Sequence, residues 1–281
     1  MPDLTAPPGL LPLYAKAAVT TPLHRGDALP SSLYSLADQH VDAAHLAAYQ
    51  RVCGFPVTDV LPATYLHVLA FPLSVALMTE RSFPFPMVGL VHVANSITVV
   101  RPVRADETVS LTVRAADLRP HPAGRQFDVL AEATVGGDVV WSGRSTYLRR
   151  GKADGPKEKK ERTSTPAPAG TVAQVRVPGD IGRRYGAVSG DRNPIHLYGL
   201  TAKAFGFPSA IAHGMWLKAR TLAALQGRLP DAFTVEVAFK KPIFLPGKVA
   251  FGSQVVDGGL DFSLTDPASG APHLVGRTRT S

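Results

Sequence analysis

The segment that decides the fold runs from residue 185 to residue 196 and reads YGAVSGDRNPIH. Asp191 and His196 are five residues apart in it, which on a regular helix would separate their side chains by ~140°. Asn193-Pro194 prevents a regular helix, because a residue before proline avoids the helical region, whereas Asn caps helices well and Pro suits a first helical position. We therefore expect a bend that turns both side chains toward one point, as acid/base chemistry requires. The alternative is a plain helix stop followed by a helix start.

A second segment, residues 212–216, reads AHGMW and lies near the start of a helix expected over 209–226. This helix follows Pro208 and stops at Gly227, the usual kind of residue just past a helix end. The first turn of a helix has free backbone N–H groups and the positive end of the dipole, which together can hold an anion. Gly214 has no side chain to keep a ligand oxygen from its amide. Alternatively, glycine at this position indicates a close contact between the helix and the sheet.

Strands are expected after this helix, at 234–241, 247–256, 260–265 and 273–279, separated by Gly-rich and Pro-containing turns. The first half repeats the order. A helix over 61–80, which Pro72 is expected to break, precedes strands at 94–101, 107–115, 126–135 and 138–148. A helix followed by an antiparallel meander is an α+β arrangement in which the helix covers one face of the sheet.

The two halves align weakly but in the same order, which indicates an internal duplication. One overlay of the halves places Arg101-Pro102-Val103 on Lys241-Pro242-Ile243, and a slightly smaller shift places Tyr49 on Tyr185 and Cys53-Gly54 on Ser189-Gly190. Between the halves, residues 149–170 are basic and then rich in Pro and Ala, as a solvated linker is. We expect an N-terminal repeat over 1–148, this linker, and a C-terminal repeat over 171–281.

Composition excludes several classes of protein. The formal charge of the 281-residue chain is +8, but residues 149–162 hold seven basic and three acidic side chains, so half of the excess lies in the linker. No aromatic residue is interleaved there to stack on bases, and we expect no nucleic acid partner. Cys53 is the only cysteine, which excludes an intrachain disulfide. No membrane span or signal peptide is expected, and we expect a cytoplasmic protein.

The sequence also lacks the familiar catalytic motifs of other enzyme classes. It has no His-Glu-x-x-His motif, no Gly-rich phosphate loop and no Gly-x-Ser-x-Gly nucleophile elbow. We expect neither a metal nor a cofactor.

Residues 185–196, together with residues 207–215 (FPSAIAHGM), closely resemble the hydratase motif of the MaoC-like (R)-specific enoyl-CoA hydratases, the hydratase 2 group. The resemblance is strongest over 175–256. With the motif in the second half only, the whole chain resembles the double hotdog members of that group, which include 3-hydroxyacyl-thioester dehydratases. The resemblance implies two hotdog repeats, each an antiparallel sheet wrapped around a central helix, that form a pseudo-dimer.

The activity that this resemblance implies is that of a hydro-lyase of fatty acid metabolism. It would catalyse the reversible hydration of a trans-2-enoyl thioester to the (R)-3-hydroxyacyl thioester. Asp191 and His196 would hold and activate the water, Asn193 would orient the site, and the Gly214 N–H would stabilise the thioester oxygen as it gains enolate character. Which of the first two takes the first proton is left open.

The substrate-binding residues that follow from the resemblance are Ser189, Gly190 and His213. Lys240 and Lys241, with Arg183 and Arg184, could meet the phosphates of coenzyme A, although solvated surface cations are the default reading. An acidic acyl carrier protein would also be attracted to a +8 partner. Both carriers stay open, as do a monomeric pseudo-dimer and a homodimer.

The first half departs from the motif, because Gly54 is followed by FPVTDV at 55–60 without an Asp and His pair. We expect it to be catalytically empty. Its apolar segments 71–78 and 83–87 could line an acyl tunnel or could be ordinary packing, and His67 aligns loosely with His213. Two alternatives to the hydratase remain, a hotdog acyl thioesterase and a non-catalytic subunit that binds acyl thioesters.

Overall fold

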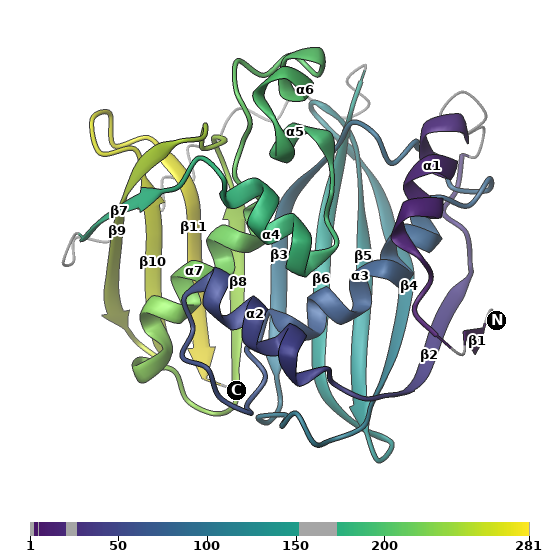
Figure 1. Cartoon of the computed structure of the whole chain (residues 1–281), viewed down its shortest axis with the longest axis horizontal. Coiled ribbons are helices and arrows are strands. Elements are labelled where there is room, and N and C mark those ends of the chain that lie inside the picture. The colour runs from purple at the N-terminus through teal and green to yellow at the C-terminus, as the bar shows by residue number, and fades with distance from the viewer. Residues whose placement is uncertain (1–2, 5, 21–26, 152–172, 281) are drawn as a thin grey trace. The chain divides into compact units, whose positions relative to one another are not determined.

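A computed structural model describes residues 3–4, 6–20, 27–151 and 173–280. Its contacts divide the chain into two compact units (Figure 1). Unit 1 comprises Met1–His40, Leu66–Ile97 and Asp106–Thr163, and unit 2 comprises Val41–Tyr65, Thr98–Ala105 and Ser164–Ser281. Unit 2 therefore takes two segments from the first half of the sequence. Most of the expected linker, 152–170, lies outside the described residues.

The sheet of unit 1 has the strand order β1-β2-β4-β5-β6-β3. Its members are β1 (Asp3–Leu4), β2 (Leu33–Gln39), β3 (Leu90–Val99), β4 (Val109–His121), β5 (Gly124–Val135) and β6 (Asp138–Arg150). The four strands predicted in this half are confirmed as β3 to β6, whereas β1 and β2 were not predicted. On β5, Phe127, Val129 and Ala131 are buried at every second position, which is the pattern of a strand with one face on a core.

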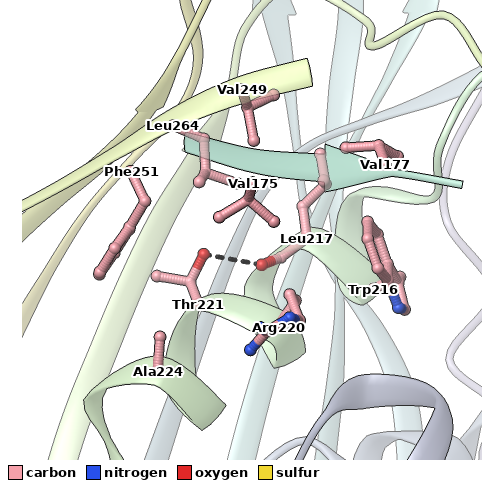
Figure 2. Close-up of a pocket in the computed structure, with 10 residues that line it drawn as sticks. All are labelled: Val175, Val177, Trp216, Leu217, Arg220, Thr221, Ala224, Val249, Phe251 and Leu264. Carbon is pink, nitrogen blue, oxygen red and sulfur yellow. Dashed lines mark hydrogen bonds between the residues drawn. The ribbon is translucent and has the colours of Figure 1, made fainter. Parts of the chain in front are cut away.

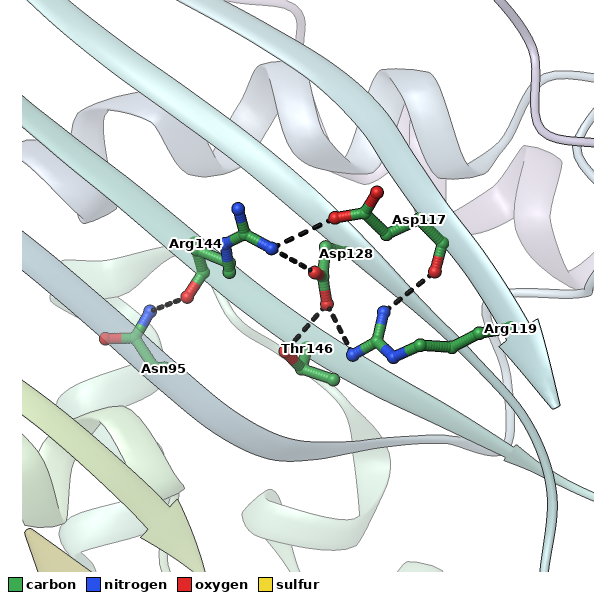
Figure 3. Close-up of polar contacts among 6 residues, drawn as sticks. All are labelled: Asn95, Asp117, Arg119, Asp128, Arg144 and Thr146. Atoms are coloured by element: carbon green, nitrogen blue, oxygen red, sulfur yellow. Dashed lines mark hydrogen bonds and ion pairs between the residues drawn. The ribbon is translucent and has the colours of Figure 1, made fainter. Parts of the chain in front are cut away.

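The other face of this sheet carries a buried charge (Figure 3). The carboxylate of Asp128 is 1% exposed and accepts hydrogen bonds from Thr146 Oγ1 at 2.7 Å, Arg144 Nη1 at 2.8 Å and Arg119 Nη2 at 3.1 Å. These donors come from β4 and β6, the neighbours of β5. A buried carboxylate is tolerated only when it is paired in this way, and the cluster ties the three strands together.

The helices of unit 1 are α1 (Leu10–Thr20) and α3 (Tyr65–Met78), whose first residue is counted with unit 2. The prediction that Pro72 breaks α3 is wrong, because the helix runs through it. Proline removes one backbone hydrogen bond. Leu73, Val75 and Leu77 after it have no exposed surface, so burial of apolar side chains on this turn maintains the helix.

The sheet of unit 2 has the order β8-β11-β10-β9-β7. Its strands are β7 (Ala173–Val177), β8 (Phe233–Phe239), β9 (Gly247–Val256), β10 (Gly259–Thr265) and β11 (Pro272–Thr280). The four strands predicted in this half are confirmed as β8 to β11. All pairings among these strands are antiparallel.

The central helix of unit 2 is α7 (Gly214–Leu225), which is buried on nearly every side and lies against the strands in Figure 1. It is followed by a short 3-10 helix, η2 (Gln226–Arg228). The helix predicted over 209–226 begins later than expected. Residues 210–212 are extended instead, because they pair with residues 243–245 through a bridge between Ile211 and Phe244.

Three short helices, α4 (Ile181–Ser189), α5 (Pro194–Leu197) and α6 (Gly199–Ala204), precede α7, and α2 (Ala43–Cys53) joins them from the first half. Trp216 Nε1 on α7 donates a 3.0 Å hydrogen bond to Val52 O on α2. The rings of Tyr49 on α2 and Tyr185 on α4 lie 6.2 Å apart. Helix α2 therefore packs on both α4 and α7, as Figure 1 shows.

The backbone repeats itself as the duplication requires. Helices α2 and α4 end at the aligned glycines Gly54 and Gly190, which have left-handed φ values of 79° and 75°. In the first half, Leu61 N donates to Val103 O and Ala105 N to Asp59 O; in the second, Ala212 N donates to Ile243 O and Leu245 N to Ala210 O.

The matching hydrogen bonds align the loops before the central helices residue by residue. Leu61 corresponds to Ala212. Pairing the residues that follow these two, one by one, gives what we call the loop alignment. Val103 corresponds to Ile243, and extending from it in both directions gives what we call the strand alignment, the same overlay that the sequence indicated. The two loops therefore share one hydrogen-bond pattern.

Among the described residues, no helix is both long and apolar enough to cross a bilayer.

Candidate active site

The bend predicted between Asp191 and His196 is present. Helix α4 ends at Gly190, whose N–H donates to Gly186 O at 3.2 Å, and α5 begins at Asn193, whose side chain accepts from Ile195 N at 3.4 Å. Glycine suits the left-handed position at the end of a helix because it has no Cβ. The chain between the two helices turns sharply, and the carboxylate and the imidazole come from opposite sides of the turn.

The Asp191 side chain is fixed within this turn. Its Oδ1 accepts from Asn193 N at 3.1 Å, and its own N–H donates to Ser189 Oγ at 3.2 Å. Ser189 is buried and Gly190 ends the helix, so the structure gives both residues a part in shaping the turn. Asp191 Oδ2 is left facing His213, with 3.9 Å between it and Nε2.

Two imidazoles complete the cluster. His196 comes from α5, and His213 is the residue just before α7, with 3% of its surface exposed. Their rings stack with centroids 3.7 Å apart and planes 28° apart. One potential ligand atom from each of Asp191, His196 and His213 lies within 4.8 Å of the other two. The structure thus brings the predicted pair together and adds His213 in direct contact.

Backbone carbonyls determine which nitrogen of each ring carries the proton. His196 Nδ1 lies 2.8 Å from Ile211 O, and His213 Nε2 lies 3.0 Å from Asp191 O. Because a carbonyl oxygen only accepts, both of these nitrogens donate when the rings are neutral. The lone pair of His196 is therefore on Nε2 and that of His213 on Nδ1.

Both histidines are neutral near pH 7. Burial lowers the pKa of His196 below 6.5, against the opposing effect of the Asp191 carboxylate. Burial, with a further contribution from His196, lowers the pKa of His213 to about 3. A neutral His196 with its lone pair on Nε2 is a base, which is the state that deprotonation of a water needs.

Two glycines that were not identified from the sequence hold this arrangement close to α4. A Cβ on Gly182 would overlap His196 O, and a Cβ on Gly186 would lie 2.9 Å from Asp191 O. Gly182 and Gly186 are four residues apart, which places them on one side of α4. That spacing was a signal in the sequence that a segment crosses α4 closely.

Gly214 begins α7, and its position is consistent with both interpretations of this glycine, an N–H open to a ligand oxygen and a close contact between helix and sheet. The first N–H groups of a helix have no partner within the helix, and no side chain caps α7. At the same time, a Cβ on Gly214 would lie 3.0 Å from the Phe239 ring on β8, which is a close contact between helix and sheet.

The four predicted cations are exposed at the surface. Lys240 and Lys241 are exposed and follow β8 directly, where their N–H groups bond His273 O and Pro272 O. Arg183 stacks on the Tyr198 ring at 5.3 Å, and Arg184 approaches Asp180 at 4.0 Å. The arginines have local partners.

Two predictions for the first half, the alignment of His67 and the role of the apolar segment 83–87, can be compared with the structure. His67 lies on α3, with its ring 6.4 Å from that of His92, and the loop alignment places Pro62 on His213. The loose alignment of His67 is therefore wrong. Phe83 and Phe85 lie with ring centroids 5.1 and 5.8 Å from that of Phe127, which is ordinary core packing in unit 1.

A metal ion fits the cluster poorly. Zinc bound by both rings would have to lie near both ring planes, at ~2.0–2.1 Å from each nitrogen. Rings stacked face to face at 3.7 Å do not offer such a point close to both lone pairs. The donor set is that of a carboxylate beside a neutral base.

A small gap beneath α7 is too small to hold a substrate. Figure 2 shows it between Trp216, Leu217 and Thr221 on the helix and Val175 and Val249 on the strands. Its volume is about 30 Å³, enough for one or two water molecules. Its walls are mainly apolar, so it is a packing gap between helix and sheet.

A mainly antiparallel sheet with a helix occurs in each unit, and in unit 2 Asp191 and His196 meet beside His213, the residue just before α7. These features define a double hotdog protein with a carboxylate and two imidazoles gathered in its second half. The model of the MaoC like domain matches residues 154–265. The chain is 37% identical, over 98% of its length and 99% of the relative's, to 3-hydroxyacyl-thioester dehydratase X of Mycobacterium tuberculosis. The chain belongs to the MaoC-like dehydratase family.

Solved structures agree with this assignment of the fold. The crystal structure of HtdX from M. tuberculosis has a TM-score of 0.79 and 37% identity, covering 89% of this chain and 100% of that one. A MaoC-like dehydratase from Phytophthora capsici has a TM-score of 0.70 at 19% identity, covering 90% of this chain and 95% of that one. The second likeness concerns the fold alone.

Proposed function

We propose that this protein is a 3-hydroxyacyl-thioester dehydratase that interconverts an (R)-3-hydroxyacyl thioester and the trans-2-enoyl thioester. The observation that carries the proposal is the meeting of Asp191 and His196, which each offer a ligand atom within 4.8 Å of the other. His196 Nδ1 is bonded to Ile211 O, so the lone pair of the neutral ring is on Nε2. The relative that matches nearly the whole chain is itself named for this activity.

The reaction suits these groups. In the hydration direction, a water bound between Asp191 and His196 loses one proton to the pair while its oxygen forms a bond to C3. The C2–C3 double bond becomes a single bond, and C2 takes up a proton returned by the pair, so one water is added in total and the pair regains its starting state. The thioester oxygen gains negative charge in between, and the Gly214 N–H is the proposed donor to it.

The remaining residues have supporting roles in this proposal. Asn193 caps α5 and so sets the position of His196. His213 donates to the Asp191 carbonyl and stacks on His196, which orients both members of the pair. Lys240 and Lys241 are proposed to meet the carrier, with coenzyme A and an acyl carrier protein as the two candidates.

The test follows the absorbance of the conjugated enoyl thioester while the protein is mixed with a medium-chain trans-2-enoyl-CoA. We expect the band to disappear and chiral analysis to give the (R)-3-hydroxyacyl thioester. Asp191→Asn and His196→Ala should each lower the rate by ~10² to 10⁴, the usual contribution of a general acid or base. Release of free thiol would instead identify a thioesterase.

Matched controls separate chemistry from folding in this test. Asp138→Asn and His40→Ala change the same residue types at exposed positions outside the cluster and should leave the rate unchanged. Near-normal activity in Asp191→Asn or His196→Ala, with controls behaving as expected, would contradict the assignment of the site.

A further inference from the structure

The duplication gives the residues of the site counterparts in the first half. Aligning Gly54 with Gly190 pairs Phe55 with Asp191. The loop alignment pairs Pro62 with His213 and Ala63 with Gly214. The carboxylate and one imidazole are therefore replaced by apolar side chains, while the backbone around them is kept.

A cavity of about 230 Å³ lies at these counterpart positions. Its walls include Phe55, Leu61, Pro62 and Ala63 from the first half, and Leu222 and Phe233 from the second. All of these residues belong to unit 2. We call this space the Pro62 cavity.

One substitution in the repeat accounts for part of the open space. The strand alignment pairs Val99 with Phe239, whose ring touches Gly214 in the second half. Val99 and Ala63 both line the Pro62 cavity. Where a phenylalanine ring presses on the start of α7, its smaller counterpart leaves room for a ligand.

The walls are mostly apolar, apart from Gln50, Thr58, Gln226 and Asp231, and so favour a neutral ligand with a large apolar part. Gln50 is buried, and its amide is already occupied by Thr58 and Val60, since Nε2 donates to their carbonyls at 2.9 and 3.3 Å. Among the described residues that line the cavity, the only charged one is Asp231, which is exposed and would repel a phosphate or carboxylate. An apolar cavity of ~150 Å³ already admits benzene, so this one is large enough for a small hydrocarbon group.

We propose that the Pro62 cavity binds the unbranched hydrocarbon chain of an acyl compound without reacting with it. It is a second, non-catalytic binding site that the duplication left behind when the acid/base groups were lost. The choice of an acyl chain among apolar ligands rests on the proposed function, whereas the cavity and its walls do not.

The test uses the single cysteine of the chain. Cys53 has no exposed surface, and burial raises its pKa to about 12, so it reacts slowly with thiol reagents. Ala63→Cys places a new thiol in the partly exposed wall of the cavity, and Val255→Cys places one on β9, where Val255 is 77% exposed and distant in sequence from every lining residue. The measurement is the rate of modification by a methanethiosulfonate reagent, with and without 1-decanol.

We expect 1-decanol at ten times its Kd to slow modification of Ala63→Cys about tenfold, because a bound ligand leaves that fraction of sites open. Modification of Val255→Cys should not change. Decanoyl-CoA should protect Ala63→Cys as 1-decanol does, and butyryl-CoA should protect it far less. Adding Leu222→Trp, which fills the cavity, should abolish protection; Phe233→Trp serves the same purpose if the first variant does not fold.

Each other outcome overturns the proposal. No protection of Ala63→Cys, or equal protection of both thiols, means that no chain binds in the cavity. Protection by decanoyl-CoA and butyryl-CoA alike, without protection by 1-decanol, assigns the binding to the carrier. Hydratase activity measured on the unsubstituted protein tests the proposed function separately, since protection by 1-decanol needs no turnover.

Discussion

The two imidazoles of the site are held in opposite tautomers, each by one backbone carbonyl. His196 bonds Ile211 O through Nδ1, and His213 bonds Asp191 O through Nε2. The sequence indicated the meeting of Asp191 and His196, because Asn193-Pro194 is a local signal for a bend. It could not indicate the tautomers, since the accepting carbonyls belong to residues whose positions depend on the tertiary fold.

The acid limb of the pH profile follows from the pKa of His196. In the proposed mechanism the neutral ring is the base, and burial lowers the pKa of His196, so the neutral form persists below pH 6.5. We expect kcat/KM to fall only at pH values below 6.5. An NMR titration of the His196 ring, assigned by its absence in His196→Ala, should give the same midpoint. A midpoint at or above 6.5 would mean that the imidazole is solvated.

Gly214 presents a problem for simple mutagenesis, because Gly214→Ala would both obstruct the amide and press on Phe239. Adding Phe239→Leu should relieve the second effect. If the amide stabilises the thioester oxygen, the double variant should recover thermal stability while its rate stays ~10²-fold or more below that of Phe239→Leu alone. Recovery of both rate and stability would leave Gly214 with a packing role only.

At the scale of elements, α4 supports the turn that carries Asp191 and His196. Its glycines at 182 and 186 let the carbonyls of His196 and Asp191 approach the helix surface. The sequence predicted neither this helix nor α2, because both are short and their burial comes from packing on each other. The helix start at Gly214 was placed five residues too early for a similar reason, since the bridge between Ile211 and Phe244 joins distant segments.

The close approach of the turn to α4 can be tested by adding methyl groups to the glycines of α4. Gly182→Ala should push α5 away and lower both stability, by about 2 kcal/mol or more, and activity, since overpacking of a buried contact typically costs ~1–3 kcal/mol. Gly186→Ala, with its nearest atom at 2.9 Å, should show a smaller loss. Gly227→Ala is the control, because a Cβ there meets nothing within 4 Å. Thermal unfolding and the enoyl-CoA assay measure both effects, and unchanged behaviour in Gly182→Ala would contradict the close approach.

For the whole molecule, the two units interleave along the chain. The strands of each half, and the duplication itself, were predicted from periodicity and turn residues, because those signals are local. The predicted meander is wrong for the first strand of each set, because β3 lies beside β6 and β8 beside β11 in the sheet. The sequence did not predict that α2 belongs to unit 2. This depends on contacts such as that between Tyr49 and Tyr185, which come from opposite halves of the sequence. The repeat boundaries expected at 148 and 171 remain a prediction about sequence ancestry.

This interleaving predicts how the chain behaves when it is divided. A fragment of residues 171–281 lacks α2, which would expose Trp216, Tyr185 and their partners. We expect the fragment alone to be inactive and to lack a cooperative thermal transition, and co-expression with residues 1–148 to restore both. Circular dichroism and the enoyl-CoA assay measure the outcome. An active, cooperatively folding 171–281 fragment would contradict the division into units.

The hydrogen bond from Trp216 to Val52 also bears on the history of the chain. If the proposed site is in the second half alone, deletion of the first half would still remove α2 and its contacts with Trp216 and Tyr185. Selection would then act on the backbone of the first half more strongly than on the side chains paired with Asp191 and His213. The first half would be retained for support, with those side chains free to change.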